Sequence, residues 1–289
     1  MEKIRAFWWY EKNFGDALNP FLLERLSGKK VIFCNQHRPY YKEEFRRFFK
    51  CLRNREWYDF RRLSWPVLDK PVVLSIGSML KYSKPNYNVW GTGFLRNDQN
   101  FIGGNIIAVR GPYTAQCLVD LGYPKCDVYG DPALLLPLVY KPLSKPKVGS
   151  CLIPHVVDYI SFMNKYKGIK ILNLETYDCA SIIDDIVSSS FVLSSSLHGV
   201  IVSHAYGIPA LWVKGKRTGT DGIKFKDYFA SVGLDVYEGD FQIDSLINLT
   251  FGQIPVEIKS LMLPEPNKIK EVQHNLLKVA PFKTVVDGY

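Results

Sequence analysis

Short apolar runs alternate with longer segments whose apolar positions recur at helical spacing along most of the chain. The runs typical of buried strands lie at Ile4–Trp9, Val72–Ile76, Ile106–Val109, Val148–Ile153, Ile169–Leu174, Phe191–Leu193 and Ala210–Val213. The helices predicted between them span Ala17–Leu26, Pro112–Gly122, Val156–Tyr166, Cys179–Ser189 and Leu197–Tyr206. Strands separated by helices of this length predict parallel sheets joined by right-handed crossovers.

A segment rich in proline and lysine divides this pattern into two parts. Pro137, Pro142 and Pro146 stand among lysines, and the alternation of strands and helices starts again at Val148. Such a segment is typical of a linker, and 289 residues suffice for two domains with separate cores. We therefore expect an α/β fold of two Rossmann-like, doubly wound parallel-sheet domains, residues 1–143 and residues 144–289, the second with additional C-terminal helices. Their central cleft is expected between the carboxyl ends of the strands.

The composition agrees with a globular protein. Hydrophobic residues make up 47% of the chain and charged residues 22%, and the apolar runs are too short or too broken for a transmembrane helix. The basic and aromatic start of the chain reaches Glu11 and Lys12 before it forms a signal-peptide core, so we expect a cytoplasmic protein. The net charge of +9 favours an anionic partner.

The motifs of several well-known chemistries are missing from the chain. There is no P-loop, dinucleotide fingerprint, G-x-S-x-G elbow or H-E-x-x-H zinc site. The cysteines form no C-x-x-C pair, so we expect buried, reduced thiols and neither a metal nor a cofactor. The six cysteines are Cys34, Cys51, Cys117, Cys126, Cys151 and Cys179.

The segment Lys42–Arg62 differs from its surroundings because it carries eight basic and four acidic residues. Its apolar residues Phe45, Phe48, Phe49 and Leu52 fall at i, i+3, i+4 and i+7, which predicts a helix with one aromatic and one cationic face. Such a helix either meets an anionic membrane surface or a lipid-linked substrate, or packs its aromatic face on the N-terminal sheet. We favour the packed interpretation, because any surface helix needs an apolar stripe. Acidic residues interleave with the basic ones and no recognised module is formed, so nucleic acid is not an expected partner.

The most informative local pattern is Phe191–Gly207, where an apolar strand runs into three serines and a helix begins near Leu197. Free N–H groups at a helix start, beside hydroxyls, bind phosphate or carboxylate. His198 stands there, where it can donate to an anion or move a proton near neutral pH. The alternative is an ordinary serine cap with a helical histidine, and His204 is expected to be structural. The anion site predicted by this pattern comprises Ser194, Ser195, Ser196, Leu197, His198 and Gly199.

Four further polar residues follow predicted strands or occupy the turns after them. Arg110 stands between an apolar strand and a predicted helix, where its guanidinium can hold a carboxylate or phosphate bidentately. His155 follows another strand end, and Asp16 and Asp131 occupy comparable turns. Each alone is equally explained by a salt bridge or a turn cap, but their shared position makes them candidates for one site.

Taken in order, six segments of the chain resemble the polysaccharide pyruvyl transferase family. The resemblance extends from about residue 4 to about residue 230, and the ordered set is more specific than any single segment. The segments are NFGDALN (Asn13–Asn19), VWGTGF (Val89–Phe94), AVRGPYTAQCLVDLG (Ala108–Gly122), YGDPALL (Tyr129–Leu135), IPHVVD (Ile153–Asp158) and SSSLHGVIVSHAYGIPALWV (Ser194–Val213).

The resemblance implies a fold similar to the GT-B glycosyltransferases and phosphoenolpyruvate as the donor. The implied product is a pyruvate ketal on a sugar of an exopolysaccharide, capsule or cell-wall glycan precursor. The acceptor is a sugar or a lipid-linked oligosaccharide, and peripheral contact with the inner membrane surface is a further expectation. In such enzymes the Arg of R-G and the Leu-His of L-H-G look like donor-binding residues, which here are Arg110, Leu197 and His198.

This chain departs from the family's pattern immediately before L-H-G, where the family often has arginine and this chain has Ser196. A cation expected near the donor is therefore missing. The candidates to supply it, just after the next strand, are Lys214, Lys216, Arg217 and Lys224.

The reaction implied by the resemblance needs two anion grips and two proton transfers. We expect Arg110 to hold one anionic end of the donor, and the serine turn with the helix start to hold the other. We expect His198 to protonate the enol carbon or the departing phosphate, and His155 or Asp16 to accept the proton of the sugar hydroxyl. Further substrate-binding candidates are Asn13, Gly15, Asp131, Lys214 and Lys224.

Two other functions fit parts of the pattern. A GT-B-type glycosyltransferase with a nucleotide-sugar donor binds its diphosphate at the same kind of helix start. A non-catalytic basic module at a membrane surface would draw on Lys42–Arg62.

Overall fold

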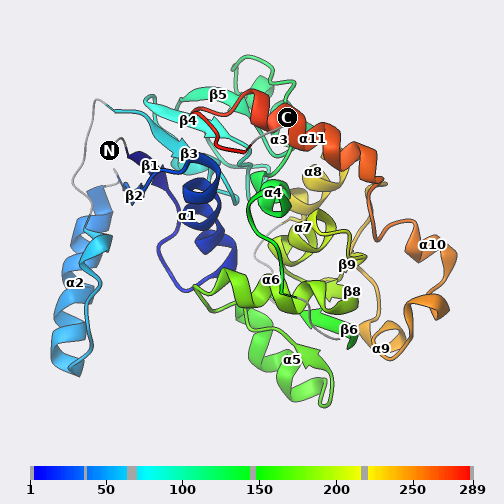
Figure 1. Ribbon diagram of the computed structural model, residues 1–289. Helices are drawn as coiled ribbons and strands as arrows, with labels where there is room; N and C mark the ends of the chain where they lie inside the picture. The colour runs from blue at the N-terminus through cyan, green and yellow to red at the C-terminus, as the bar shows by residue number, and fades with distance from the viewer. Residues whose placement is uncertain (1–2, 36–37, 64–69, 144–147, 216–220, 287–289) are drawn as a thin grey trace.

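The strands of this protein form two separate parallel sheets. The computed structural model describes residues 3–35, 38–63, 70–143, 148–215 and 221–286 (Figure 1). The first sheet has the strand order β2-β1-β3-β4-β5 and the second the order β7-β6-β8-β9, and all pairs are parallel. The predicted α/β fold with two parallel sheets is therefore confirmed.

The elements follow one another in the order that the apolar pattern predicted, with additions. The strands are β1 (Ile4–Phe7), β2 (Val31–Phe33), β3 (Val72–Leu74), β4 (Tyr87–Trp90), β5 (Asn105–Ala108), β6 (Val148–Ile153), β7 (Lys170–Ile171), β8 (Ser189–Ser194) and β9 (Ala210–Trp212). The α-helices are α1 (Phe14–Ser27), α2 (Arg38–Asn54), α3 (Pro112–Asp120), α4 (Leu136–Val139), α5 (Tyr159–Lys165), α6 (Cys179–Val187), α7 (Leu197–Ala205), α8 (Ile223–Ser231), α9 (Ile243–Leu246), α10 (Val256–Lys259) and α11 (Pro266–Lys278). Short 3₁₀ turns are η1 (Phe60–Arg62), η2 (Leu80–Tyr82), η3 (Pro132–Leu135), η4 (Val156–Asp158) and η5 (Phe251–Gln253).

The strand order reverses once in each sheet. In the first sheet the chain leaves β1 for β2 on one side and later returns to place β3 on the other side. In the second sheet β6 has β7 on one side and β8 on the other. The loops after the two strands at such a reversal lead to opposite sides of the sheet. A crevice therefore opens at the carboxyl ends of these strands, and it typically holds the ligand. The fold thus offers two crevices, one per sheet.

The second sheet is buried on both faces, because its strands alternate between two hydrophobic clusters. In β8, Val192 points into the cluster that faces the first sheet, whereas Phe191 and Leu193 point into a cluster on the opposite side. That opposite cluster is closed by the C-terminal segments around Ile243 and Met262. A strand with period-two alternation between two apolar layers is held firmly in register.

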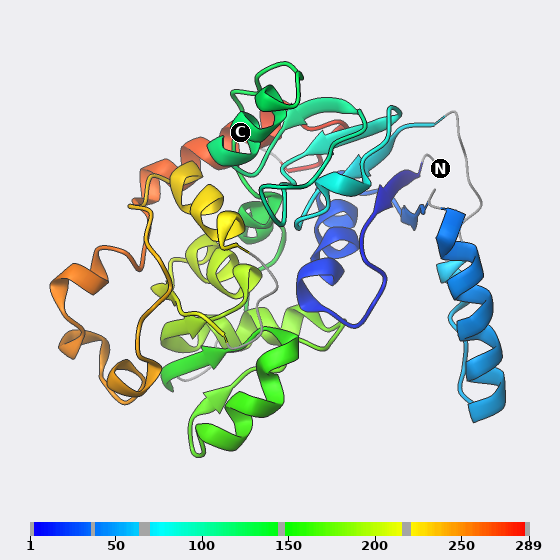
Figure 2. The same ribbon diagram turned by 180° about the vertical axis from the view of Figure 1, so that it is seen from behind.

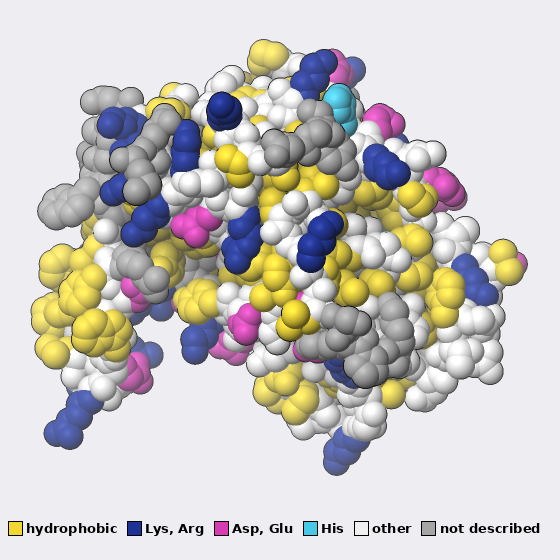
Figure 3. Space-filling view, in the orientation of Figure 1, with side chains coloured by type: hydrophobic (Ala, Val, Ile, Leu, Met, Phe, Trp, Pro, Cys, Tyr) yellow, Lys and Arg dark blue, Asp and Glu magenta, His cyan; other side chains and the backbone are white. Residues whose placement is uncertain are grey.

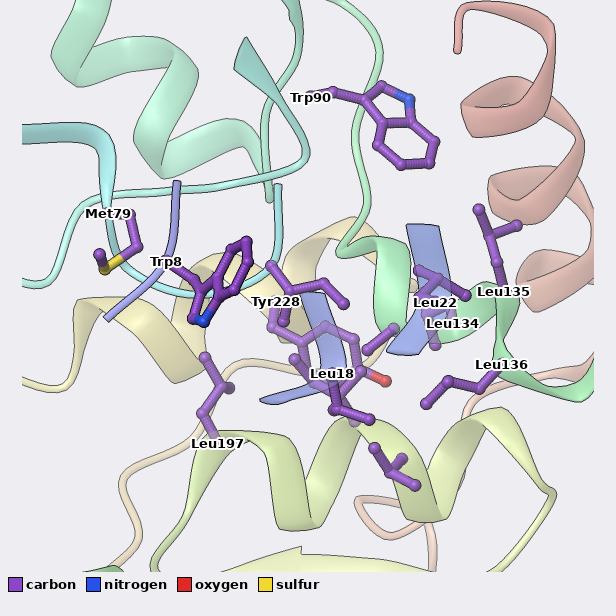
Figure 4. Close-up of a cluster of buried hydrophobic side chains, with 14 of the residues drawn as sticks. Trp8, Leu18, Leu22, Met79, Trp90, Leu134, Leu135, Leu136, Leu197 and Tyr228 are labelled. Atoms are coloured by element: carbon purple, nitrogen blue, oxygen red, sulfur yellow. The ribbon is translucent and has the colours of Figure 1, made fainter. Parts of the chain in front are cut away.

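The cluster between the sheets is shared by both parts of the chain. Figure 4 shows Trp8, Leu18 and Leu22 of the first part lying close to Leu197 and Tyr228 of the second. Their side chains are almost fully buried. Burying an aliphatic or aromatic side chain stabilises a fold by roughly 2 kcal/mol, so this shared core fixes the position of one sheet against the other.

The C-terminal helix α11 returns to the first part of the chain (Figure 1). The indole of Trp90 donates to the carbonyl of Leu276 at 3.0 Å, and the amide of Gln273 donates to the carbonyl of Leu134 at 2.7 Å. Helix α11 therefore covers η3 and the end of β4 rather than the second sheet. The predicted division of the chain after residue 143 stays a prediction.

Helix α2 stands away from the sheets, as Figures 1 and 2 show from opposite sides. Phe45, Phe49 and Leu52 are 63%, 58% and 64% exposed, so the favoured prediction that this face packs on the N-terminal sheet is wrong. The amphipathic pattern correctly predicted a helix, but the segment after α2 folds back on another face. There Glu44 is buried and accepts hydrogen bonds from the Tyr58 hydroxyl at 2.7 Å and Arg62 at 2.9 Å.

Two further predictions concern the burial of the cysteine thiols and the absence of a transmembrane helix. None of the six cysteines forms a disulfide; four are buried as predicted, and Cys51 and Cys117 are half-buried. In the described ranges no helix combines the length and the apolar character needed to cross a bilayer.

Candidate functional site

A cavity of about 230 Å³ lies where the crevices of the two sheets face each other. Its walls come from the loops after β1, β3, β6 and β8, the strands on either side of each reversal, together with η2 and the start of α8. The shared core in Figure 4 reaches this wall at Met79 and Leu197. The lining residues are Trp9, Asn13, Asp16, Gly77, Ser78, Met79, Lys81, Tyr82, Leu95, His155, Val156, Leu174, Ser196, Leu197, His198 and Lys224.

The start of α1 touches the start of α7 at one point. Gly15 lies so close to His198 that an added Cβ would stand 2.1 Å from the ring Nδ1. Asn13 caps α1 by accepting from the N–H of Gly15 at 2.9 Å, which holds this backbone in place. The NFGD and LHG segments, distant in sequence, are therefore two sides of one packed contact.

Close backbone approaches also join the other predicted segments. A Cβ on Gly93 would stand 2.6 Å from the guanidinium carbon of Arg110, and a Cβ on Gly111 would stand 2.0 Å from the carbonyl oxygen of Asp227. Gly91, with φ +88°, leaves the space that Pro132 fills. Glycine at these positions lets the segments VWGTGF, R-G-P and G-D-P-A pack directly on one another.

Arg110 is fully buried behind the cavity wall rather than in it. Its Nε lies 3.0 Å from the Oδ2 of Asp227, and its two other nitrogens donate to the Ser78 hydroxyl at 2.8 Å and the Phe94 carbonyl at 2.6 Å. Asp227 also accepts from the N–H and hydroxyl of Thr114. The predicted direct contact of Arg110 with a ligand is therefore not what this arrangement provides: Ser78 lies between the guanidinium and the cavity.

Lys224 is the buried cation that lines the cavity. It is 7% exposed, and no carboxylate in the described part of the chain lies within ion-pair distance of it. Burial, with a smaller contribution from the charge of Arg110, lowers the pKa of Lys224 to about 8. A buried ammonium without a carboxylate partner is costly unless a ligand supplies the negative charge. Of the two candidates that lie in the described residues, Lys214 and Lys224, the fold brings Lys224 to the cavity.

His198 lines the cavity, and Asp131, which is not part of the lining, lies close to its ring. The His198 Nε2 and the Asp131 Oδ2 are 3.9 Å apart, and both atoms are buried without a hydrogen-bond partner among the residues described. Burial raises the pKa of Asp131 to about 7. Burial, helped by the charges of Lys224 and Arg110, lowers the pKa of His198 to about 3. Without an anion His198 is therefore neutral.

Asp16 and His155 stand on opposite walls of the same cavity. Burial raises the pKa of the Asp16 carboxyl to about 7, although the N–H of Trp9 donates to it at 3.2 Å. Burial and the charge of Lys224 lower the pKa of His155 to about 4. Asp16 thus titrates near neutral pH, and His155 is a neutral imidazole.

The three serines before α7 divide into two roles. The Ser194 hydroxyl lies 2.8 Å from the carbonyl of Ile153 and 2.9 Å from that of Ser196, which share its single proton. The Ser195 hydroxyl accepts from the N–H of His155 at 2.9 Å. Both side chains are buried and hold the turn, whereas Ser196 lines the cavity. Gly199 gives Ser194 its space, because a Cβ there would lie 2.4 Å from the hydroxyl. The first free N–H groups of α7 therefore start at the cavity wall.

Some predicted residues lie elsewhere. Lys214 is exposed and pairs with Glu238 at 3.3 Å and Asp240 at 2.9 Å, away from the cavity lining. Lys216 and Arg217 lie outside the described residues. His204 is buried between the Tyr228 hydroxyl and the Ala210 carbonyl, which agrees with a structural role.

Two residues of the cavity lining, Ser78 and Lys81, and the buried Asp227 behind it were not predicted from the sequence. Ser78 follows the apolar run that ends at Ile76, the same signal that marked Arg110 and His155. Lys81 stands at the cavity mouth with its ammonium 4.8 Å from the ring centre of Tyr82. Asp227 had no local signal, because its importance comes from pairing with an arginine far away in the sequence.

Comparisons with known proteins give one family and two similar proteins. Residues 13–216 match the family described as polysaccharide pyruvyl transferase. The uncharacterized protein L143 of Acanthamoeba polyphaga mimivirus is 29% identical over 239 residues, which cover 77% of this chain and 72% of the viral protein. The glycosyltransferase SnogD from Streptomyces nogalater covers 96% of this chain and 96% of its own, with a TM-score of 0.37 and 10% identity. A TM-score this low carries no argument about the arrangement of the two sheets.

Proposed function

This chain belongs to the polysaccharide pyruvyl transferase family, and we propose that it transfers the pyruvyl group of phosphoenolpyruvate onto two hydroxyls of a sugar in a glycan precursor. The observation that carries the proposal is the cavity between the two sheets, where the unpaired cation Lys224 lies beside the start of α7. In this proposal the C-terminal part of the chain supplies most of the donor site, with Ser78 and Lys81 of the N-terminal part added to it, and Asp16 of the N-terminal part faces the acceptor.

The donor carries a phosphate and a carboxylate, and the cavity has two sets of groups that can bind an anion. Lys224, with Lys81 nearer the mouth, supplies charge for one group. Ser196 and the first N–H groups of α7 supply hydrogen-bond donors and the positive end of the helix dipole for the other. The pKa of Lys224, lowered to about 8 by burial, rises when an anion binds, so the bound lysine is fully charged.

In this proposal Arg110 does not contact the donor and acts through Ser78, which lines the cavity. Its guanidinium donates to the Ser78 hydroxyl, so that hydroxyl is free to donate its own proton toward a ligand oxygen in the cavity. Its charge also adds to the positive potential felt at Lys224 and His198. We therefore assign Arg110 as a positioning residue and Lys224 as the direct anion ligand.

His198 is the proposed acid and Asp16 the proposed base. A bound dianion raises the pKa of His198 from about 3, so the imidazole takes up a proton that it delivers to the methylene carbon of the donor. A sugar hydroxyl adds to the cationic C2, and its proton passes to Asp16, whose pKa of about 7 suits this task at neutral pH. Phosphate leaves, the second hydroxyl adds to C2, and the ketal forms with release of its proton. His155 orients the acceptor as a neutral imidazole.

The free thiols agree with a cytoplasmic site for this reaction. Six cysteines that form no disulfide are typical of a protein that folds in a reducing compartment.

The test of the function is donor dependence. With a sugar that carries two neighbouring hydroxyls, purified protein should release inorganic phosphate from phosphoenolpyruvate and form a product heavier by the pyruvyl group. Release of a nucleoside diphosphate from a nucleotide sugar, with no phosphate released from phosphoenolpyruvate, would support the glycosyltransferase alternative and overturn the proposal.

The test of the mechanism is the substitution His198→Ala. Positioned acid–base groups contribute about 10²–10⁴-fold, so turnover should fall by that factor. The matched control is His274→Ala, which removes an exposed imidazole on α11. Unchanged turnover in His198→Ala would show that His198 is not the acid of the reaction. It would leave the assignment of phosphoenolpyruvate as the donor substrate unaffected.

A further inference from the structure

Exposed aromatic rings form one continuous patch on α2 and the segment that folds back on it. Phe45 contacts Phe49 with ring centres 6.4 Å apart, and Phe49 contacts Phe48 at 5.6 Å. The contacts continue from Phe48 to Phe60 at 6.1 Å and from Phe60 to Trp57 at 6.3 Å. Trp57 is 87% exposed, and Phe45, Phe49, Phe60 and the neighbouring Leu52 are each more than half exposed. We call this set, Phe45, Phe48, Phe49, Leu52, Trp57 and Phe60, the aromatic patch.

A row of cations runs beside the aromatic patch. Lys42, Arg46, Lys50 and Arg53 follow one another at helical spacing, each of the last three one position after an apolar residue of the patch. One position on an α-helix is a rotation of about 100°, so the cations flank the apolar stripe along its length. All four are exposed, and none forms an ion pair with a residue in the described ranges.

The patch lies on a projecting part of the molecule. Figure 3 shows yellow side chains gathered on α2 at the left, with a Lys or Arg at its tip, and a hollow between this helix and the body. A convex surface with large apolar rings at its centre and cations at its edge fits a flat partner with apolar depth and negative charge. A second copy of this chain is disfavoured, because a symmetric contact would bring the cation rows of both copies together.

We propose that the aromatic patch and its cation row dock α2 on the surface of an anionic phospholipid bilayer. The rings of Trp57, Phe49 and Phe45 enter the boundary between headgroups and acyl chains, and the cations contact the lipid phosphates. The long lysine and arginine stems can lie along the apolar boundary while their charges stay at the headgroups. This docking is independent of the proposed reaction, because no residue of the patch lines the cavity.

The experiment is flotation of the full chain with phosphatidylcholine vesicles and with vesicles that also contain phosphatidylglycerol. We expect binding to the anionic vesicles that weakens as salt is raised. The double variant Phe49→Ser/Trp57→Ser should lower the partition coefficient at least tenfold, and so should Lys50→Glu/Arg53→Glu. Each has a matched control elsewhere on the surface: Ile160→Ser/Val256→Ser for exposed apolar residues and Lys270→Glu/Lys278→Glu for the same change in net charge. Both controls should bind as the unaltered chain does.

Three results would overturn the proposal. The unaltered chain does not float with anionic vesicles; or the patch variants and their controls bind equally; or sedimentation shows a stable dimer that Phe49→Ser dissociates, which would assign the patch to a second copy. Circular dichroism of each variant checks that the fold is kept. Phosphate release with a water-soluble acceptor should be the same in all of them, so loss of docking is distinguishable from loss of the reaction.

Discussion

At the scale of single residues, the site holds two cations, Lys224 and Arg110, close to two imidazoles that burial keeps neutral. Lys224, Arg110, His198 and His155 lie around one cavity, and burial together with mutual repulsion lowers the pKa values of Lys224 and both histidines. Asp227 neutralises only Arg110. We propose that a small dianion bound here offsets the charge of Lys224, as the phosphate and carboxylate of the proposed donor would.

The first prediction at this scale concerns Lys224. Replacing Lys224 by Met removes the direct anion ligand but keeps the volume, so kcat/KM for phosphoenolpyruvate should fall by roughly 10²-fold or more. The stability should not fall, because an unpaired buried charge is removed. Steady-state kinetics and urea unfolding measure both effects. The matched control is Lys226→Met, two positions away, where the lysine pairs with Glu238 outside the cavity; equal effects in both variants would contradict the assignment.

The second prediction concerns the protonation of Asp131. Its pKa is about 7 in the folded chain against 3.8 for an ordinary aspartate, so between about pH 4 and pH 7 the native state keeps a proton that the unfolded chain releases. The free energy of unfolding of the unaltered chain should therefore fall across this window relative to Asp131→Asn, by about 4 kcal/mol at pH 8. Asparagine can still accept from the N–H of Ala133. Chemical unfolding of both proteins from pH 4 to pH 8 is the measurement, with the exposed Asp235→Asn as control; parallel curves would show that Asp131 is ionised in the native state.

At the scale of elements, the site is assembled by contacts between the starts of helices. Helix α1 meets α7 where Gly15 faces His198, and α3 meets α8 where Gly111 faces Asp227. The glycines permit backbone approaches that no other residue allows, so the ordered segments of the sequence are the pieces of one packed junction.

This view predicts a specific effect of Gly15→Ala. The new methyl group would overlap the His198 ring and displace it, and a displacement of about 1 Å can cost 10²-fold in rate. The helix itself should not lose stability, since alanine is favoured over glycine inside helices by roughly 0.5–1 kcal/mol. The control is Gly149→Ala in β6, where an added Cβ meets no atom within 4 Å. Full activity of Gly15→Ala would show that the position of the His198 ring is unimportant.

The elements also show what the sequence could and could not predict. Apolar runs and helix starts correctly predicted most strands and the start of α7 at Leu197, because these signals are local. The anion site at that helix start stays a prediction. The pairing of Arg110 with Asp227 could not be predicted, since nothing near either residue indicates the other. The pattern of α2 predicted one aromatic and one cationic face, but it could not predict whether the aromatic face packs on the sheet. An amphipathic sequence has the same pattern in a packed helix and in an exposed one. The strands β2 and β4 were missed because the runs Val31–Phe33 and Tyr87–Trp90 are short.

At the scale of the whole molecule, the C-terminal helix connects the last part of the chain to the first. Leu276 of α11 is fully buried, its carbonyl accepts from Trp90, and its side chain packs close to Gly130 of the G-D-P-A segment. The helix thus supports the turn that carries Asp131 from the side away from the cavity.

A substitution in α11 tests this support. Leu276→Ala should lower the free energy of unfolding by about 2–5 kcal/mol through the lost apolar contact and the cavity left behind. The exposed neighbour His274→Ala should change it by less than about 0.5 kcal/mol. Urea unfolding of both variants is the measurement. A change in Leu276→Ala no larger than in the control would mean that α11 is not part of the shared core.

The central claim is that a small dianion binds between the two sheets, and a crystal structure of the chain soaked with phosphoenolpyruvate tests it most directly. The account predicts the donor in the cavity, with one anionic group at Lys224 and the other at Ser196 and the first N–H groups of α7. A donor bound elsewhere, or a nucleotide sugar that occupies this cavity while phosphoenolpyruvate does not, would contradict it.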